Sequence, residues 1–281
     1  MLEHTIKYGN IKLLFTKPLV MGIINFTPDS FYAQSRVETE KQIHERIEQM
    51  LSEKVDIIDV GGYSSRPNAE DVSFNEELDR LANGLKILKK IAPEIPVSVD
   101  TFRSQIVENV FDRFGHFIVN DISAGELDDK MFDTVAKLKL PYIAMHMKGN
   151  PRTMQSNLIY NNLPQEISDY FTRKIEQLRQ AGISEIIIDP GFGFSKTLEH
   201  NYNLLANLQE FQKFELPLLV GFSRKSMLYN LFNTTSEKSL NATTVVNTVA
   251  VQKGANILRV HDVRAAVEVV EIIEKLKNAK E

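Results

Sequence analysis

The chain of 281 residues contains no cysteine. It can therefore form neither a disulfide framework nor a thiolate metal site or nucleophile, and a reducing compartment is permitted. It also lacks an apolar run long enough to span a bilayer, and residues 1–12 lack the apolar core of a secretory signal. We expect a cytoplasmic protein without a membrane partner.

An excess of positive charge is missing as well. The 33 lysines and arginines against 37 aspartates and glutamates give a net charge of -4, and both signs are scattered along the chain. A protein that follows a phosphate backbone needs a basic patch, so we expect no nucleic-acid partner. No linker rich in proline, glycine or serine divides the chain, which predicts one domain over residues 1–281.

Eight short apolar runs alternate with longer amphipathic stretches. Runs rich in valine, isoleucine and leucine are typical of parallel strands buried on both faces, and the stretches between them are typical of covering helices. Eight such units predict the α/β class and a single (β/α)8 TIM barrel. The predicted strands are residues 20–25, 55–60, 97–100, 117–121, 142–146, 186–189, 218–221 and 257–259.

The segment before the first strand has a different pattern. Residues 5–15, with a Tyr-Gly-Asn turn at their centre, predict a β-hairpin, and we expect residues 1–18 to cap the N-terminal mouth of the barrel. Among the helices, Ser73 and Glu76 have the spacing of a capping box, and Asp262 precedes the final helix. We interpret these three residues as structural.

Polar side chains follow nearly every apolar run. In a barrel of parallel strands the C-terminal strand ends face the reaction, whereas a single Asp or Asn at a strand end is more often a helix cap or a loop residue. Recurrence on nearly every strand favours a functional site. The residues are Asn25, Asp59, Asp100, Asn120, Asp121, His146, Asp189, Ser223, Lys225, Arg259 and His261.

Three of these residues indicate a class of ligand. Asp100, Asn120 and Asp189 end strands of otherwise aliphatic composition, where an unpaired charge would be expensive. Together they offer acceptors and donors to a flat heterocycle with ring N–H and amino groups, such as a guanine-like or pterin edge.

Two groups of cations indicate an anionic ligand. Arg224 and Lys225 would stand in a first helical turn, where the helix dipole disfavours positive charge. Either they reach solvent or an acidic neighbour, or they bind an anionic or carbonyl ligand. Arg259 and His261 end the eighth strand, where barrels often bind phosphate, and the alternative for them is surface charge. With Asn25 and Arg66 they could hold a diphosphate and its magnesium.

The chain resembles the dihydropteroate synthases, folate-pathway enzymes that join a dihydropterin to p-aminobenzoate. The resemblance spans the whole barrel, and the motifs are specific in combination. They lie at residues 21–31, 61–67, 98–101, 120–122, 189–194, 223–226 and 259–262.

The resemblance implies roles for individual residues of this chain. The pterin would be bound by Asp100, Asn120, Asp189, Lys225 and Arg259. The diphosphate would be bound by Asn25, Arg66, Arg259 and His261, with Mg²⁺ on Asn25. The p-aminobenzoate would be bound by Ser65, Arg66, Pro67, Phe194 and Ser223. The catalytic residues would be Asp29, Asp100 and Lys225.

The resemblance also implies a homodimer, a mobile lid at residues 26–36 and a target of sulfonamides. The chain departs from the family's Gly-Gly-Glu-Ser-Thr-Arg-Pro-Gly after the second strand, because it has Tyr63, Ser65 and Asn68 for Glu, Thr and the last Gly. Ser65 keeps the hydroxyl, so we expect only a modest change in affinity for p-aminobenzoate or sulfonamides.

Two other functions are compatible with parts of the pattern. An aldolase-type barrel would use Lys225 as a Schiff-base lysine, but it would not explain three polar groups suited to a flat heterocycle. A pterin-binding module of the methyltransferase type would explain those groups without synthase activity. It would have no need of the lid or of the diphosphate residues.

Overall fold

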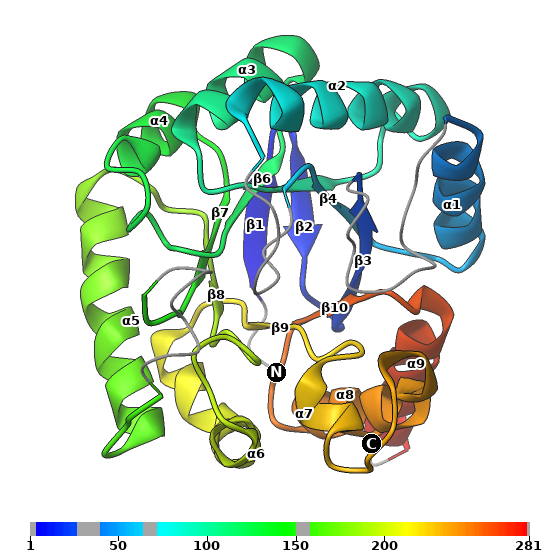
Figure 1. The fold of residues 1–281 in the computed structure, drawn as a ribbon, viewed down its shortest axis with the longest axis vertical. Coiled ribbons are helices and arrows are strands. Elements are labelled where there is room, and N and C mark those ends of the chain that lie inside the picture. Colours follow the sequence, from blue (N-terminus) through cyan, green and yellow to red (C-terminus); the bar gives the residue numbers. More distant parts are fainter. Residues whose placement is uncertain (1–3, 27–39, 64–71, 150–157, 280–281) are drawn as a thin grey trace.

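The computed structural model describes residues 4–26, 40–63, 72–149 and 158–279. Eight parallel strands form a barrel with helices outside it (Figure 1). Their order is β8-β7-β6-β5-β4-β3-β10-β9, and a parallel bridge between Ile188 and Leu218 closes the ring. The strands are β3 (Leu19–Asn25), β4 (Ile57–Gly61), β5 (Val97–Asp100), β6 (Ile118–Asp121), β7 (Tyr142–Met145), β8 (Ile186–Asp189), β9 (Leu219–Val220) and β10 (Ile257–Val260).

Helices form the outer layer of the barrel in Figure 1. They are α1 (Glu40–Ser52), α2 (Phe74–Ile91), α3 (Ser104–Phe114), α4 (Met131–Leu138), α5 (Leu163–Gln180), α6 (Leu198–Ala206), α7 (Ser226–Tyr229), α8 (Leu240–Gln252) and α9 (Val263–Asn278), with 3₁₀ turns η2 (Leu208–Phe214) and η3 (Ser236–Lys238). Each long helix buries an apolar stripe, as Ile43, Ile47 and Met50 do on α1. Among the described residues, no helix combines the length and apolarity needed to cross a membrane.

The predicted (β/α)8 barrel is confirmed, with small differences at the strand ends. β4 begins at Ile57 and not at Val55, because the Val55 N–H bonds to the Met50 carbonyl and completes the end of α1. β7 ends at Met145, one residue before His146. β9 has only two paired residues, shorter than the predicted 218–221.

The predicted hairpin is present as β1 (Thr5–Tyr8) and β2 (Ile11–Leu14), paired antiparallel. Its Ile6 and Leu13, with Phe15, are buried against residues at the N-terminal ends of the barrel strands. Figure 1 shows β1 and β2 within the outline of the barrel. The hairpin therefore closes the N-terminal mouth, as the sequence predicts.

The strands change character along their length. Side chains two residues apart on a strand point to the same side, so both members of each such pair face the barrel interior. The first member belongs to the apolar cluster under the hairpin, and the second is polar. The pairs are Ile57 and Asp59, Ile118 and Asn120, Ile187 and Asp189, and Ile257 and Arg259.

The helix starts agree only in part with the prediction. The Ser73 hydroxyl accepts the Glu76 N–H at 3.2 Å and caps α2. Asp262 stands at the cap position of α9 but makes no capping hydrogen bond, because its carboxylate is held by Arg224. Its role is structural, as predicted, but through an ion pair.

Candidate active site

An arginine joins two carboxylates at the C-terminal mouth of the barrel. Arg259 on β10 donates through Nε to Asp59 at 2.7 Å and through Nη2 to Asp100 at 2.8 Å. The Asn120 amide donates to the other Asp59 oxygen at 3.2 Å. Asp59 is fully buried, so its charge depends on these partners. Strands distant in sequence are thus joined by one hydrogen-bonded cluster.

The acidic groups of the site have shifted proton affinities. Burial raises the pKa of Asp100 to about 7, against the opposing effect of Arg259, and the charge of Asp59 adds to the rise. Burial also raises the pKa of Asp189, and the nearby Lys225 opposes this. Groups with such shifts in one cleft are typical of functional sites.

Lys225 follows β9, the strand next to β10, at the same mouth. Its Nζ donates to the Phe192 carbonyl at 2.5 Å and lies 4.7 Å from the centre of the Phe194 ring. Burial lowers the pKa of Lys225 to about 8, and Asp189 opposes the shift. The residue stands in extended conformation just before α7, so its ammonium is not in a helical turn.

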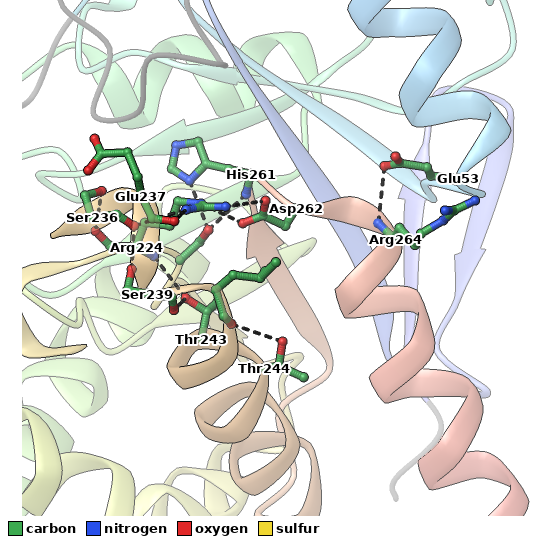
Figure 2. Close-up of polar contacts among 12 residues, drawn as sticks. Glu53, Arg224, Ser236, Glu237, Ser239, Thr243, Thr244, His261, Asp262 and Arg264 are labelled. Atoms are coloured by element: carbon green, nitrogen blue, oxygen red, sulfur yellow. Dashed lines mark hydrogen bonds and ion pairs between the residues drawn. The ribbon is translucent and has the colours of Figure 1, made fainter. Parts of the chain in front are cut away.

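Arg224, next to Lys225, has a different role. It adopts a left-handed backbone with φ of 56°, and its guanidinium makes two 2.8 Å hydrogen bonds to the carboxylate of Asp262 (Figure 2). The same guanidinium donates to the carbonyls of Ser236 and Glu237. The sequence leaves two interpretations open for this cation pair, contact with an acidic neighbour or binding of a ligand. The first is correct for Arg224, whereas Lys225 faces the candidate site.

His261 and Ser223 meet beside this network. The His261 N–H donates to the Ser223 hydroxyl at 3.1 Å, and its Nδ1 lies 3.0 Å from the same oxygen. Burial, with Arg259 and Arg46 next in effect, lowers the pKa of His261 to about 3. The imidazole is therefore neutral at physiological pH and can meet an anion as a hydrogen-bond donor.

Asn25 ends β3 with its amide oxygen beside Gly61. A Cβ on Gly61 would lie 3.0 Å from that oxygen, so glycine keeps the space in front of it open. Among the described residues, no group of three or more His, Cys, Asp or Glu side chains could hold a metal ion. A cation at Asn25 could take further oxygen ligands from substrate phosphates and water.

A family model described as pterin binding enzyme matches residues 21–261. Over 268 residues the chain is 40% identical to the dihydropteroate synthase of Escherichia coli (strain K12), with 94% of this chain and 93% of that protein covered. The chain belongs to the dihydropteroate synthase family. The predicted enzyme, a transferase of a pterinylmethyl group, is thereby confirmed.

Solved structures agree with this membership. The Yersinia pestis dihydropteroate synthase with a sulfonamide drug has a TM-score of 0.92 and 37% identity, over 98% of this chain and 100% of that one. The Xanthomonas albilineans dihydropteroate synthase with 4-aminobenzoic acid has a TM-score of 0.89 and 31% identity, over 98% of each chain.

Some residues implied by the dihydropteroate synthase resemblance lie outside the described parts of the chain. They are Asp29, Ser65, Arg66 and Pro67, together with Asn68 and all of the expected lid after Phe26. Of the departures in the second loop, only Tyr63 is described. Its ring packs edge-on against Phe102 at 5.1 Å, with the Arg103 guanidinium 5.3 Å from its centre.

Two strand-end residues serve structure. The Asp121 carboxylate accepts hydrogen bonds from Ser123, Gly125 and the Tyr142 hydroxyl. His146 contacts Lys196 and does not belong to the Arg259 network. Both occur in the strand-end pattern because a polar residue there can equally brace a loop.

Two contributors to this dihydropteroate synthase site do not follow from the sequence. The sequence predicts Asp59 as a strand-end residue without a partner, whereas in the structure it holds Arg259 and Asn120. Arg46 on α1 donates to the His261 carbonyl and adds a positive charge there. Its position next to the apolar stripe of α1 was the only available signal.

Proposed function

We propose that this mouth holds 6-hydroxymethyl-7,8-dihydropterin diphosphate with its pterin among Asp100, Asn120 and Asp189. The observation that carries the proposal is the convergence of these three groups with Arg259 and Lys225 in one partly buried cluster. Asp189 supplies acceptors to the amino-pyrimidine edge, while the guanidinium of Arg259 stacks on the ring.

In the same proposal the diphosphate lies where β3 and β10 are neighbours, as the register of Arg259 opposite Met21 supports. Asn25, Arg259 and the neutral His261 contact it together with Arg66. The single amide oxygen of Asn25 suits Mg²⁺, which is commonly held by one or two protein oxygens plus substrate phosphates and water. When bound, Mg²⁺ would neutralise charge on the leaving diphosphate.

The p-aminobenzoate ring is proposed to lie beside Phe194 and Ser223, with Ser65, Arg66 and Pro67 completing its pocket. Phe194 belongs to a small apolar cluster with Ile122, Met145 and Met147 at this end of the barrel. Such a surface suits a flat aromatic ring. A relative crystallised with a sulfonamide drug supports the same pocket as a sulfonamide target.

The chemistry follows from these positions. The bond between the methylene and the diphosphate oxygen breaks first, and the electron-rich dihydropterin shares the positive charge, which Asp100 and Asp29 stabilise. The neutral arylamine then attacks the methylene and loses its proton afterwards. No covalent enzyme intermediate is needed, which accounts for the lack of a nucleophile and base pair in the predicted site.

We also propose a cytoplasmic homodimer. Exposed apolar residues on the last helices, Val245 on α8 and Ile272 and Leu276 on α9, offer a surface for a second copy. Light scattering on the purified chain should give the mass of two chains. A monomer at micromolar concentration would contradict this part.

The test is to mix the protein with the dihydropterin diphosphate, p-aminobenzoate and Mg²⁺, and to follow dihydropteroate by mass and pyrophosphate by an independent assay. We expect equal amounts of both products, loss of turnover with a chelator, and inhibition by a sulfonamide. Pterin binding without either product would favour a binding module of the methyltransferase type. Trapping of Lys225 by borohydride with a carbonyl substrate would favour an aldolase.

A further inference from the structure

A second lysine is buried near the site and has no role in the chemistry above. Lys196 is 4% exposed. Its Nζ donates to the carbonyls of Gly191 at 2.9 Å and Phe194 at 3.0 Å, and lies 3.1 Å from His146 Nδ1. These three partners are neutral acceptors that together match the three hydrogens of an ammonium group. Burying such a cation is expensive, and these hydrogen bonds offset part of the cost.

Two of the three contacts hold the turn between β8 and α6, residues 189–196, in its shape, and the contact with His146 ties the turn to the end of β7. The turn is already pressed against that strand, because a Cβ on Gly191 would lie 2.1 Å from the His146 carbonyl. Ser195 adds a second tie, accepting the Lys148 N–H at 3.0 Å and donating to the Lys148 carbonyl at 2.7 Å. Lys196 therefore fixes the turn through the side that faces His146.

The other side of this turn supports the site. The Phe192 carbonyl accepts from Lys225, and the Phe194 ring lies under the same ammonium. Lys196 holds the Phe194 carbonyl, so its ties act on the residue whose ring faces Lys225. A displacement of the turn would move both supports of Lys225 together.

We propose that Lys196 is a positioning residue for the synthase reaction, which holds the 189–196 turn in the shape that presents the Phe192 carbonyl and the Phe194 ring to Lys225. The proposal rests on the proposed function, since it takes Lys225 and Phe194 to contact the substrates. Small displacements of groups around a reacting centre can reduce a rate by about 100-fold.

The surrounding charges set the pH at which to test it. Burial lowers the pKa of Lys196 to about 7, Asp189 raises it, and Lys225 and Lys148 lower it further. The pKa of His146 lies well below its usual value through burial and the charges of Lys196 and Lys148, so its ring can accept a hydrogen bond. Below the pKa of Lys196 its three donors are complete, so the comparison is best made slightly on the acid side of neutrality.

The absence of cysteine allows a selective experiment. Lys196→Cys, unfolded, is alkylated with 2-bromoethylamine, which restores an ammonium at the length of lysine, or with 1-bromopropane, which gives the same shape with a methyl group. After refolding, we expect the aminoethyl form to approach wild-type turnover. We expect the propyl form to lose about 10- to 100-fold in kcat/KM for p-aminobenzoate.

Lys174 provides the matched control. It is also buried, but on α5, where it pairs with Glu126 outside the barrel. Lys174→Cys given the same two reagents should show the same kcat and KM with either, although its stability can differ. A folded propyl form of the Lys196 variant with the kinetics of the aminoethyl form would overturn the proposal.

A second variant tests the proposal without refolding, in case the alkylated Lys196→Cys protein does not refold. His146→Leu, made in the native chain, removes one acceptor of the Lys196 ammonium and should raise the KM for p-aminobenzoate at least threefold. An unchanged KM would contradict the proposal. Wild-type enzyme carried through unfolding and refolding reports on the proposed function itself, so its failure to form dihydropteroate is distinguishable from a failure of the positioning role.

Discussion

The two ends of the barrel are built on the same strands and differ in what those strands carry. At the N-terminal end Ile57 and Ile257 pack under the hairpin, and two residues later Asp59 and Arg259 form an ion pair. The two isoleucines exclude water and need no hydrogen-bond partner. Asp59 is buried as well and Arg259 is partly buried, yet each depends on a specific neighbour.

The residues that stabilise the barrel and those assigned to chemistry thus lie on the same strands at opposite ends. We call the cluster of Ile57 and Ile257 under the hairpin the apolar layer, and the polar residues at the C-terminal mouth, with Asp59, Arg259 and Lys225, the charged layer. The apolar layer tolerates a change of shape at modest cost, because dispersion and burial are spread over many contacts. A charged layer fails when one member is removed, because the remaining charges stay buried and unpaired. Substitutions at the two ends should therefore differ in kind.

The largest effect is expected for Arg259→Met. It leaves Asp59 and Asp100 buried without their cation, so the free energy of unfolding should fall by about 3–5 kcal/mol at neutral pH. Turnover should be lost as well. Urea unfolding measures the free energy of unfolding, and the assay of dihydropteroate and pyrophosphate measures turnover.

The matched control lies two residues earlier on β10. Ile257→Val should cost about 0.5–1.5 kcal/mol of unfolding free energy and leave kcat and KM unchanged. The comparison of the two ends breaks down if Arg259→Met is as stable as wild type, or if the Ile257 variant loses activity.

Next in size are substitutions within the charged layer. Lys225→Ala should reduce kcat/KM for the dihydropterin substrate about 10- to 100-fold, as loss of a charged hydrogen bond predicts. His261→Ala should act mainly on the diphosphate, weakening binding of pyrophosphate with Mg²⁺ in calorimetry. Wild-type behaviour in both variants would refute the two assignments.

A smaller and reversible effect is expected from pH. Asp100 ionises as the pH rises through about 7, and Lys225 loses its proton as the pH rises through about 8. The form with an ionised Asp100 and a protonated Lys225 is thus most populated between these values, so kcat/KM should be a narrow bell. Asp100→Asn should remove the rising limb. Lys225→Arg should remove the contribution of Lys225 to the falling limb and leave that of Lys196, whose pKa is about 7. A flat profile would contradict both assignments.

The smallest effect on turnover is expected in the hairpin. Ile6→Val removes one methylene from the apolar layer and should reduce the free energy of unfolding by about 0.5–1.5 kcal/mol. Because the hairpin closes the mouth opposite the site, kcat/KM should stay within about twofold of wild type. A larger kinetic change would show that the two ends are coupled.

The sequence predicts the barrel well, because buried parallel strands and amphipathic helices have distinct periods. It predicts Lys225 and Arg224 as one pair but cannot separate them, because the Asp262 partner of Arg224 lies 38 positions away in the sequence and is brought close only by the fold. It also gives no sign of Lys196, because two of its three partners are backbone carbonyls, which every residue carries.

The most direct measurement is a crystal structure of the chain with the dihydropterin diphosphate and Mg²⁺. We expect the amino-pyrimidine edge within about 3 Å of Asp189 and Asn120, with the diphosphate at Asn25 and His261. A pterin bound elsewhere, with Asp189 and Asn120 making no contact to it, would contradict the assignment of the charged layer to substrate binding.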